Sequence, residues 1–328
     1  MTNRERMQKV LNGESAMHVP VIEWAAWWNQ TIDKWHAENS SIPTNQHDLY
    51  DYFGLDMQYQ FWLSPNDGQL PPPAYHGAPV ISNEKEFEAA LPHLFSEQKL
   101  TQLHDWLRSL KEKHERGECS IWYSLEGFFW FPRTLFGIEN HLYAFYDYPE
   151  LMLEMNNRLV EYYKKAIDVI YDVLTPEFMT LAEDMSYNHG PMISKDLYDE
   201  FMAPFYNEII PIIKKRGTKV LIDTDGDVEP LIPWFSECGI EGVLPLERQA
   251  GVDVNRIRAN YPDWIMIGGY DKTVMHLGEA AMRKEFERIL PAIKSGRYIP
   301  SVDHQTPPDV SLENYKIFVK LLKEYSKK

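Results

Sequence analysis

Eight short apolar segments recur along the chain of 328 residues and alternate with longer amphipathic segments. The eight are Val19–Trp24, Gly54–Leu63, Ser120–Gly127, Phe178–Met185, Lys219–Gly226, Gly242–Glu247, Trp264–Asp271 and Arg297–His304. Nearly continuous apolar runs of this length are typical of strands that are buried on both faces. Strand and helix repeated eight times predict an α/β fold, a single parallel (β/α)8 TIM barrel, which commonly reaches this length.

The segments between the later strands carry apolar residues at three- and four-residue spacing, which predicts helices. Helices are expected at Leu151–Leu174, Leu197–Arg216, Val228–Cys238, Val254–Ala259, Glu279–Lys294 and Leu312–Lys327. No shift in composition marks a second domain, so residues 1–328 are interpreted as one barrel domain. A loop-rich insertion is expected around residues 64–118, where the proline-rich stretch Ser64–Pro79 would lie over the barrel mouth.

Composition excludes several classes of protein. The formal net charge is −16, so nucleic acid is not expected as a partner, because phosphate binding needs clustered Lys and Arg. No run of about 18 apolar residues is present, so no membrane span is expected. The N-terminal segment lacks an apolar signal core, and Cys119 and Cys238 provide no disulfide framework. These features predict a cytoplasmic protein.

Acidic residues recur where the predicted strands end. In a parallel barrel these C-terminal ends meet at one face, and active sites lie there. The acids at these ends are Glu23, Glu126, Glu183, Asp184, Asp223, Asp225, Glu247, Asp271 and Asp303. His304 ends the last strand, and His189 follows the fourth. The pattern predicts an acidic site at the mouth of the barrel.

Asp223 and Asp225 are two positions apart at a strand end, so both can face the barrel axis. Two carboxylates there need a cation or a shared proton. The four candidate metal ligands are Asp223, Asp225, Glu247 and His304. The alternative is ordinary turn and cap chemistry, because Asp227 is well placed as a helix N-cap. A calcium loop of the EF-hand type is excluded, since Gly226 falls too early in that pattern.

Aromatic residues follow three successive strand ends. They are Trp24, Trp27 and Trp28 after the first strand, Phe61 and Trp62 in the second, and Phe128, Phe129, Trp130 and Phe131 after the third. Any single aromatic residue is more often part of the core. Three such clusters at neighbouring strand ends favour an aromatic-lined pocket at the mouth.

Five segments together are similar to blocks of one known superfamily. They are RERMQKVLNGESAMHVPV, EDMSYNHGPMISKDLYDEFMAPFYNEII, GTKVLIDTDGDVEPLIPWFSECGIEGVLPLE, IGGYDK and YIPSVDHQTPPDVSLENY. The sequence resembles the uroporphyrinogen decarboxylase superfamily, which also contains corrinoid-dependent methyltransferases. The resemblance runs nearly end to end and implies a barrel enzyme.

Two departures bear on the reaction that the resemblance implies. Uroporphyrinogen decarboxylases carry an arginine-rich segment after the first strand, whereas this chain has no arginine between Arg6 and Arg108. Thiol-directed zinc methyltransferases place His-x-Cys after strand five and another Cys after strand eight. Here Asp223, Asp225 and His304 hold those positions, so thiolate ligands are replaced by ligands that suit zinc, manganese or iron.

These features favour a methyltransferase that moves a methyl group from an O-methylated, aromatic substrate to the corrinoid (cobalamin) of a partner protein. A divalent metal, most plausibly zinc, would polarise the ether oxygen. Glu183, Tyr187 or His189 would deliver a proton to it. The substrate pocket would include Trp24, Trp27 and Phe129.

Two alternatives remain open at this point. One is a metal-independent decarboxylase of a smaller acid, in which Asp and His residues supply protons. The other is a non-catalytic carrier of a corrinoid or tetrapyrrole. The resemblance also implies a possible homodimer.

Overall fold

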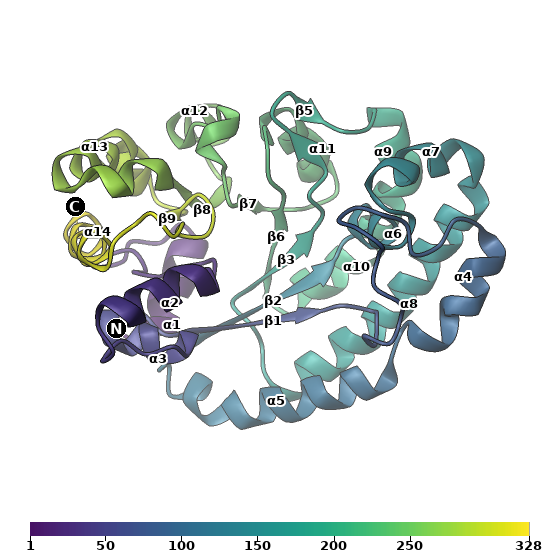
Figure 1. Cartoon of the computed structure of the whole chain (residues 1–328), viewed down its shortest axis with the longest axis horizontal. Coiled ribbons are helices and arrows are strands. Elements are labelled where there is room, and N and C mark those ends of the chain that lie inside the picture. Colours follow the sequence, from purple (N-terminus) through teal and green to yellow (C-terminus); the bar gives the residue numbers. More distant parts are fainter. Residues whose placement is uncertain (328) are drawn as a thin grey trace.

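The computed structural model describes residues 1–327, and seven parallel strands form its main sheet, which is curled (Figure 1). The strands are β1 (Gln58–Leu63), β2 (Ser120–Glu126), β3 (Phe178–Ala182), β6 (Lys219–Asp223), β7 (Gly242–Leu244), β8 (Ile265–Tyr270) and β9 (Tyr298–Val302). Their order in the sheet is their order in the chain, so each crossover leads to the neighbouring strand. A separate antiparallel hairpin joins β4 (Ser186–Tyr187) and β5 (Gly190–Pro191).

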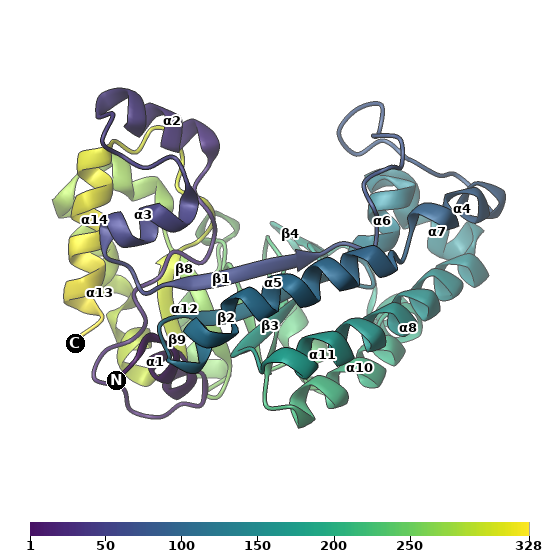
Figure 2. The same cartoon turned by 90° about the horizontal axis from the view of Figure 1, so that it is seen from below.

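Helices surround the sheet, as the alternating sequence pattern predicts. The α-helices are α1 (Asn3–Leu11), α2 (Asn29–Glu38), α3 (Gln46–Phe53), α4 (Glu84–Ala90), α5 (Glu97–Glu115), α6 (Trp130–Phe136), α7 (Ile138–Asp147), α8 (Pro149–Val173), α9 (Lys195–Phe201), α10 (Ala203–Lys215), α11 (Ile232–Glu237), α12 (Val254–Asn260), α13 (Glu279–Ser295) and α14 (Leu312–Tyr325). The 3₁₀ turns are η1 (Leu91–His93), η2 (Glu229–Leu231), η3 (Arg248–Ala250) and η4 (Lys272–Leu277). Figure 2 shows α5 and α8 running side by side along the outside of the sheet.

The eighth predicted strand, Val19–Trp24, is extended but forms no strand ladder. Side chains from both edges of the sheet bond its backbone instead: the Trp24 N–H donates to Ser301 Oγ of β9 at 3.3 Å, and the Glu23 carbonyl accepts from Gln58 Nε2 of β1 at 2.8 Å. Pro20 lacks an N–H group, which interrupts any ladder there. The segment therefore lies between β9 and β1, and the prediction of eight strands is wrong by this one.

The segment predicted as a loop-rich insertion, residues 64–118, is irregular only in its first part. Residues 64–83 contain no helix and no named strand, and α4, η1 and the long helix α5 follow. α5 has a buried apolar face of leucines at helical spacing, which packs it onto the body of the fold. Figure 2 shows the irregular segment standing out near α6 and α7.

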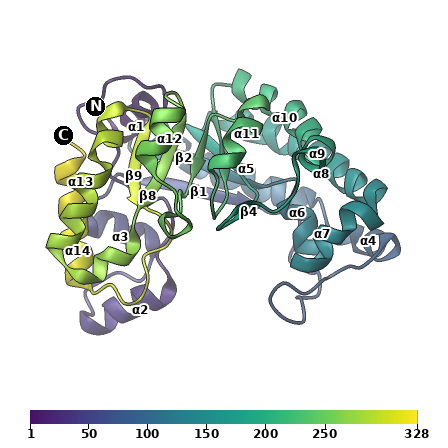
Figure 3. The same ribbon diagram turned by 90° about the horizontal axis from the view of Figure 1, so that it is seen from above.

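The strand register gathers the C-terminal ends of the strands at one edge. Ala182 pairs with Asp223, and Asp223 pairs with Leu244 on the next strand. On the other half of the sheet, Tyr270 pairs with Val302. Figure 3 shows α13 and α14 at one end of the molecule and α6 and α7 at the other, with the sheet between them.

None of the helices within residues 1–327 combines the length and the apolar character that crossing a membrane requires.

Candidate active site

A pocket of about 380 Å³ opens at the C-terminal ends of the strands. Its lining residues are Trp24, Ala25, Ala26, Gln60, Trp62, Trp130, Ala182, Glu183, Asp184, Asp223, Asp225, His304 and Gln305. They come from the segment after residue 19 and from the ends of β1, β2, β3, β6 and β9. Three tryptophans and four acids share the lining, and it contains no Lys or Arg. The volume is that of a small-molecule site.

Asp223 and Asp225 are the central acids of this pocket. Neither side chain makes a hydrogen bond within residues 1–327, and the nearest basic atom to Asp225 is His304 Nε2, 3.9 Å from Oδ2. Burial, with the neighbouring Asp225 and Asp184 carboxylates, raises the pKa of Asp223 well above its usual value. Burial, followed by Asp184 and Glu247, raises the pKa of Asp225 to about 7. The pair can therefore hold a proton near neutral pH.

Asp184 has an ion-pair partner of its own. Its φ of 44° is in the left-handed region, which Asp tolerates better than most residues. Arg133 Nη1 lies 3.0 Å from Asp184 Oδ2 and also donates to the Asp184 carbonyl at 2.7 Å. The Arg133 guanidinium lies 5.2 Å from the centre of the Trp130 ring. Arg133 is thus engaged by Asp184 and Trp130.

Glu183 lines the pocket, but its carboxylate is held by the protein. It accepts the backbone N–H groups of Phe128, Phe129 and Trp130 at 2.7 to 3.1 Å, and it accepts the Tyr206 hydroxyl. This arrangement is a capping site at the start of α6. A Cβ atom at Gly127 would lie 1.9 Å from the Glu183 carboxyl carbon, so a glycine is required there. We therefore assign Glu183 to positioning α6 instead of the proton transfer expected from the sequence.

The other two predicted proton donors lie outside the pocket lining. Tyr187 and His189 belong to the β4–β5 hairpin, where Tyr187 is 48% exposed and its ring lies 5.6 Å from that of His189. The hairpin backbone lies close to the β6 loop, since a Cβ at Gly226 would lie 2.6 Å from Tyr187. The hairpin therefore supports the loop that carries Asp225, and it does not bring either side chain to the pocket.

The four predicted metal ligands are only partly gathered. Asp223, Asp225 and His304 line the pocket, whereas Glu247 accepts the Gly226 N–H at 3.1 Å and is absent from the lining. Across residues 1–327, no three His, Cys, Asp or Glu side chains are close enough to hold one metal ion. As placed, this donor set does not fit the closed or three-ligand geometry that zinc requires. Metal binding here stays a prediction.

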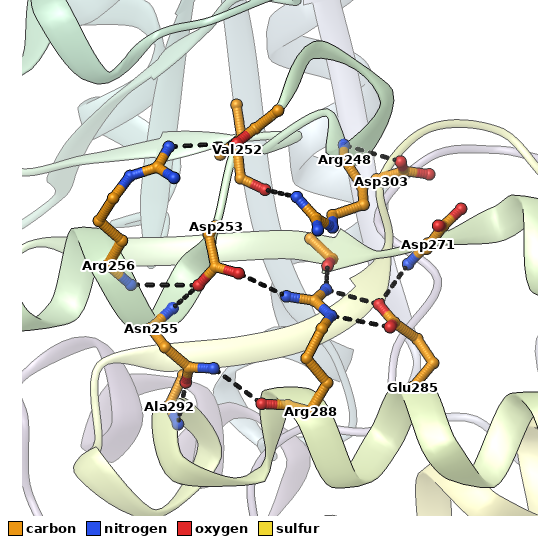
Figure 4. A network of polar contacts seen from close by, with 12 residues as sticks. Arg248, Val252, Asp253, Asn255, Arg256, Asp271, Glu285, Arg288, Ala292 and Asp303 are labelled. Carbon is orange, nitrogen blue, oxygen red and sulfur yellow. Dashed lines mark hydrogen bonds and ion pairs between the residues drawn. The ribbon is translucent and has the colours of Figure 1, made fainter.

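A polar network braces the loops on one side of the pocket (Figure 4). Asp303 is fully buried and accepts the backbone N–H groups of Arg248 at 2.9 Å and Lys272 at 3.2 Å. Burial is the largest cause that raises the pKa of Asp303, to about 6. Below it, Arg288 bonds both Asp253 and Glu285, which ties the start of α12 to α13. The network fixes the loops after β7 and β8, and His304 follows directly on Asp303.

His304 faces an acidic pocket as a mainly neutral group. Burial, and next the Lys272 ammonium, lower the pKa of His304 below its usual value. The Lys272 ammonium itself lies 3.7 Å from Asp303 Oδ1.

Of the three aromatic residues predicted for the substrate pocket, the structure places one in the pocket lining. Trp24 lines the pocket, but Trp27 and Phe129 are buried in the core and are absent from the lining. Trp27 packs edge-on against Tyr50 and Tyr315. The position of Trp27 and Phe129 after a strand end does not show in which direction each side chain points. In the structure both rings are buried in the apolar core.

The sequence interpretation missed several pocket residues. Gln60 and Gln305 line the pocket without having been predicted, whereas Trp62, Trp130 and Asp184 were expected at the mouth only as members of the aromatic and acidic clusters, with no individual role. A signal was present for three of them, because Trp62, Trp130 and Asp184 stand in or directly after a strand end.

Comparisons with known proteins agree with this architecture. A uroporphyrinogen decarboxylase from Hydrogenobaculum sp. is 26% identical over 188 residues, which are 55% of this chain and 49% of that protein. The chain thus aligns with about half the length of that curated relative. The solved structure of a methyltransferase from Methanosarcina mazei matches with a TM-score of 0.68 at 14% identity, covering 99% of both chains.

That likeness concerns the fold, which is barrel-like in both proteins. The family model described as uroporphyrinogen decarboxylase (URO-D) matches residues 71–325, well over half of the chain. The chain belongs to the uroporphyrinogen decarboxylase family.

Proposed function

We propose that this protein is a methyltransferase that moves a methyl group from the oxygen of a small aromatic methyl ether to the corrinoid of a partner protein. The observation that carries the proposal is the pocket itself, whose lining combines Trp24, Trp62 and Trp130 with the Asp223 and Asp225 carboxyls. Aromatic walls suit an aromatic ring. A protonated carboxyl group can donate its proton to the ether oxygen as that oxygen leaves the methyl group.

In this proposal Asp223 is the general acid. Its pKa is raised by burial and by neighbouring carboxylates, and its side chain has no hydrogen-bond partner within residues 1–327 that would compete for the proton. The methyl carbon loses its bond to the ether oxygen, and that oxygen takes the proton from Asp223. Gln60 and Gln305, which also line the pocket, can orient the substrate by hydrogen bonds.

The methyl acceptor would be presented at the mouth of the pocket. A pocket of about 380 Å³ holds a small molecule and is too small for a whole corrinoid. When bound, the corrinoid supplies the electron pair that forms the new bond to the methyl carbon.

Decarboxylation is the competing function in this family. A carboxylate substrate would have to enter a pocket whose lining contains four acids and no Lys or Arg. The lining therefore favours an uncharged or cationic substrate over an anionic one, since like charges repel strongly where water is excluded.

The test is methyl transfer from 4-methoxyphenol to free cob(I)alamin, followed by the change in absorbance of the corrinoid. We expect Asp223→Asn to lower the rate at least about 100-fold, the contribution of a well-placed general acid. Asp227→Asn removes the same charge from the same loop outside the pocket lining, and it should stay close to the wild-type rate. Release of carbon dioxide from an aromatic acid without corrinoid would reject methyl transfer.

Metal content decides between a proton and a Lewis acid as the group that activates the oxygen. Protein purified without chelator is analysed beside Asp225→Ala and His304→Ala. About one equivalent of zinc, manganese or iron that is lost in both variants would establish the metal site predicted from the sequence and reject Asp223 as the acid.

A further inference from the structure

Asp225 lines the pocket and has no Lys or Arg at ion-pair distance within residues 1–327. We propose that the methyl donor carries an ammonium group beside its aromatic ether, bound by Asp225 within the walls formed by Trp24, Trp62 and Trp130. This inference rests on the proposed function, because it names the substrate class of the same pocket.

The basic side chains near the pocket already have carboxylates of their own. Arg133 pairs with Asp184 at 3.0 Å, and Lys272 lies 3.7 Å from Asp303. No Lys or Arg within residues 1–327 lies within ion-pair distance of Asp225. The basic group at that distance is His304, whose Nε2 lies 3.9 Å from Asp225 Oδ2. A carboxylate that is partly withdrawn from water gains most from a cation that reaches it, and a ligand can bring that cation.

Two of the three tryptophans that line the pocket have partners for their indole N–H groups within the protein. Trp24 Nε1 donates to the Val302 carbonyl at 2.7 Å, and Trp62 Nε1 donates to Glu126 at 3.3 Å. A ligand would therefore meet these two residues as apolar aromatic surface. Trp130 already holds a cation, the Arg133 guanidinium, at 5.2 Å from its ring centre. Aromatic rings with a nearby carboxylate are the usual environment of a bound ammonium group.

Trp62 is the most exposed of the three tryptophans that line the pocket. It is 47% exposed, although a large apolar side chain is normally buried. Its position in the pocket lining explains this exposure, because a bound ligand would cover the ring.

The first experiment tests whether the positive charge of a ligand, at constant shape, increases its affinity for the pocket. Calorimetric titration compares 4-(trimethylammonio)phenol with 4-tert-butylphenol, which have the same shape and differ in one positive charge. We expect the cation to bind about 10-fold tighter or better, as a cation among aromatic rings and a carboxylate should. Equal binding of the two phenols, or binding of neither, overturns the inference.

Two variants assign the effect to the proposed residues. Asp225→Asn keeps the shape of the side chain and removes its charge, so it should abolish most of the preference for the cation. Asp227→Asn makes the same change in net charge outside the pocket lining and should keep the preference. Thermal unfolding of both variants checks that they fold. Loss of the preference in both, or in neither, would reject Asp225 as the binding group.

A second experiment separates this inference from the proposed function. Methyl transfer to cob(I)alamin is measured with 4-methoxyphenethylamine, 4-propylanisole and 3-(4-methoxyphenyl)propionate as donors. Fastest transfer from the amine supports both proposals. Equal or faster transfer from the neutral or anionic ether supports methyl transfer and rejects the cationic donor. No transfer from any ether, with tight binding of the cationic phenol, rejects methyl transfer and keeps cation recognition.

Discussion

The carboxylates at the two ends of the parallel sheet differ in how many hydrogen-bond partners they have. Glu177 precedes β3 at the N-terminal end, and Asp223 closes β6 at the C-terminal end. Glu177 accepts from Arg4 at 2.7 Å, from His114 at 3.0 Å and from the Ile121 N–H at 2.8 Å. Asp223 has no such partner within residues 1–327. In enzymes with barrel-like folds, the N-terminal end of the sheet commonly contributes to stability, and the C-terminal end carries the active site.

Glu183 shows that position at the mouth does not by itself make an acid reactive. It lies one residue beyond β3, at the same edge as Asp223, yet three backbone N–H groups and Tyr206 saturate its carboxylate. The useful distinction is therefore the number of partners: of the four acids that line the pocket, Asp223 and Asp225 are the two whose side chains accept no hydrogen bond within residues 1–327.

The largest expected effect on stability is at the N-terminal end. Glu177→Ala leaves His114 and Arg4 without their carboxylate, so the free energy of unfolding should fall by about 3 kcal/mol. Chemical denaturation measures this change. Glu118→Ala, which removes an exposed carboxylate, is the control and should leave the free energy of unfolding close to the wild-type value.

An equal loss of stability in Asp223→Asn and Glu177→Ala would contradict the difference between the two ends of the sheet. We expect the unfolding free energy of Asp223→Asn to stay within about 1 kcal/mol of wild type or to rise, because an unpartnered buried carboxyl contributes little to stability.

Glu183→Gln tests the intermediate case. The amide nitrogen of Gln cannot accept a hydrogen bond, so at least one buried N–H at the start of α6 loses its acceptor, at a cost of about 2 kcal/mol. Denaturation midpoints measure the loss. If methyl transfer fell as steeply as in Asp223→Asn while stability stayed unchanged, Glu183 would be a catalytic acid after all.

The most gradual expected effect is a pH dependence set by Glu23. Burial raises its pKa from 4.5 to about 8, although Tyr315 and Ser301 donate hydrogen bonds to it. The folded state then keeps a proton that the unfolded chain has released. Stability is therefore greatest below the unfolded pKa and falls as pH rises toward 8, by at most about 1.4 kcal/mol per pH unit.

Glu23→Gln should flatten this dependence, because the amide cannot ionise. Unfolding free energies at pH 5, 6, 7 and 8 give the slopes for the two proteins. Other buried acids keep part of the slope in the variant, such as Asp303, whose pKa is about 6. Identical slopes would show that Glu23 does not hold the proton.

Local sequence pattern accounts for most of the fold. Seven of eight predicted strands are present because a buried parallel strand is an uninterrupted apolar run, which a linear sequence displays. Val19–Trp24 is a similar apolar run but forms no strand ladder with a neighbour. Pro20 has no N–H group to donate, and the Glu23 carbonyl accepts from the side chains of Gln58 and Tyr50 instead of from a neighbouring strand.

The sequence by itself determined the acidic mouth, since residues at the ends of parallel strands must meet at one edge. Only the tertiary structure decided which acids are free. Glu177 is satisfied by Arg4, 173 residues away, and Glu183 by Tyr206, 23 residues away. Tertiary contacts also decided that the side chain of Trp24 lines the pocket and that Trp27 and Phe129 are buried in the core. Such partners depend on contacts between distant segments, and these contacts decide the pKa and the availability of each carboxyl.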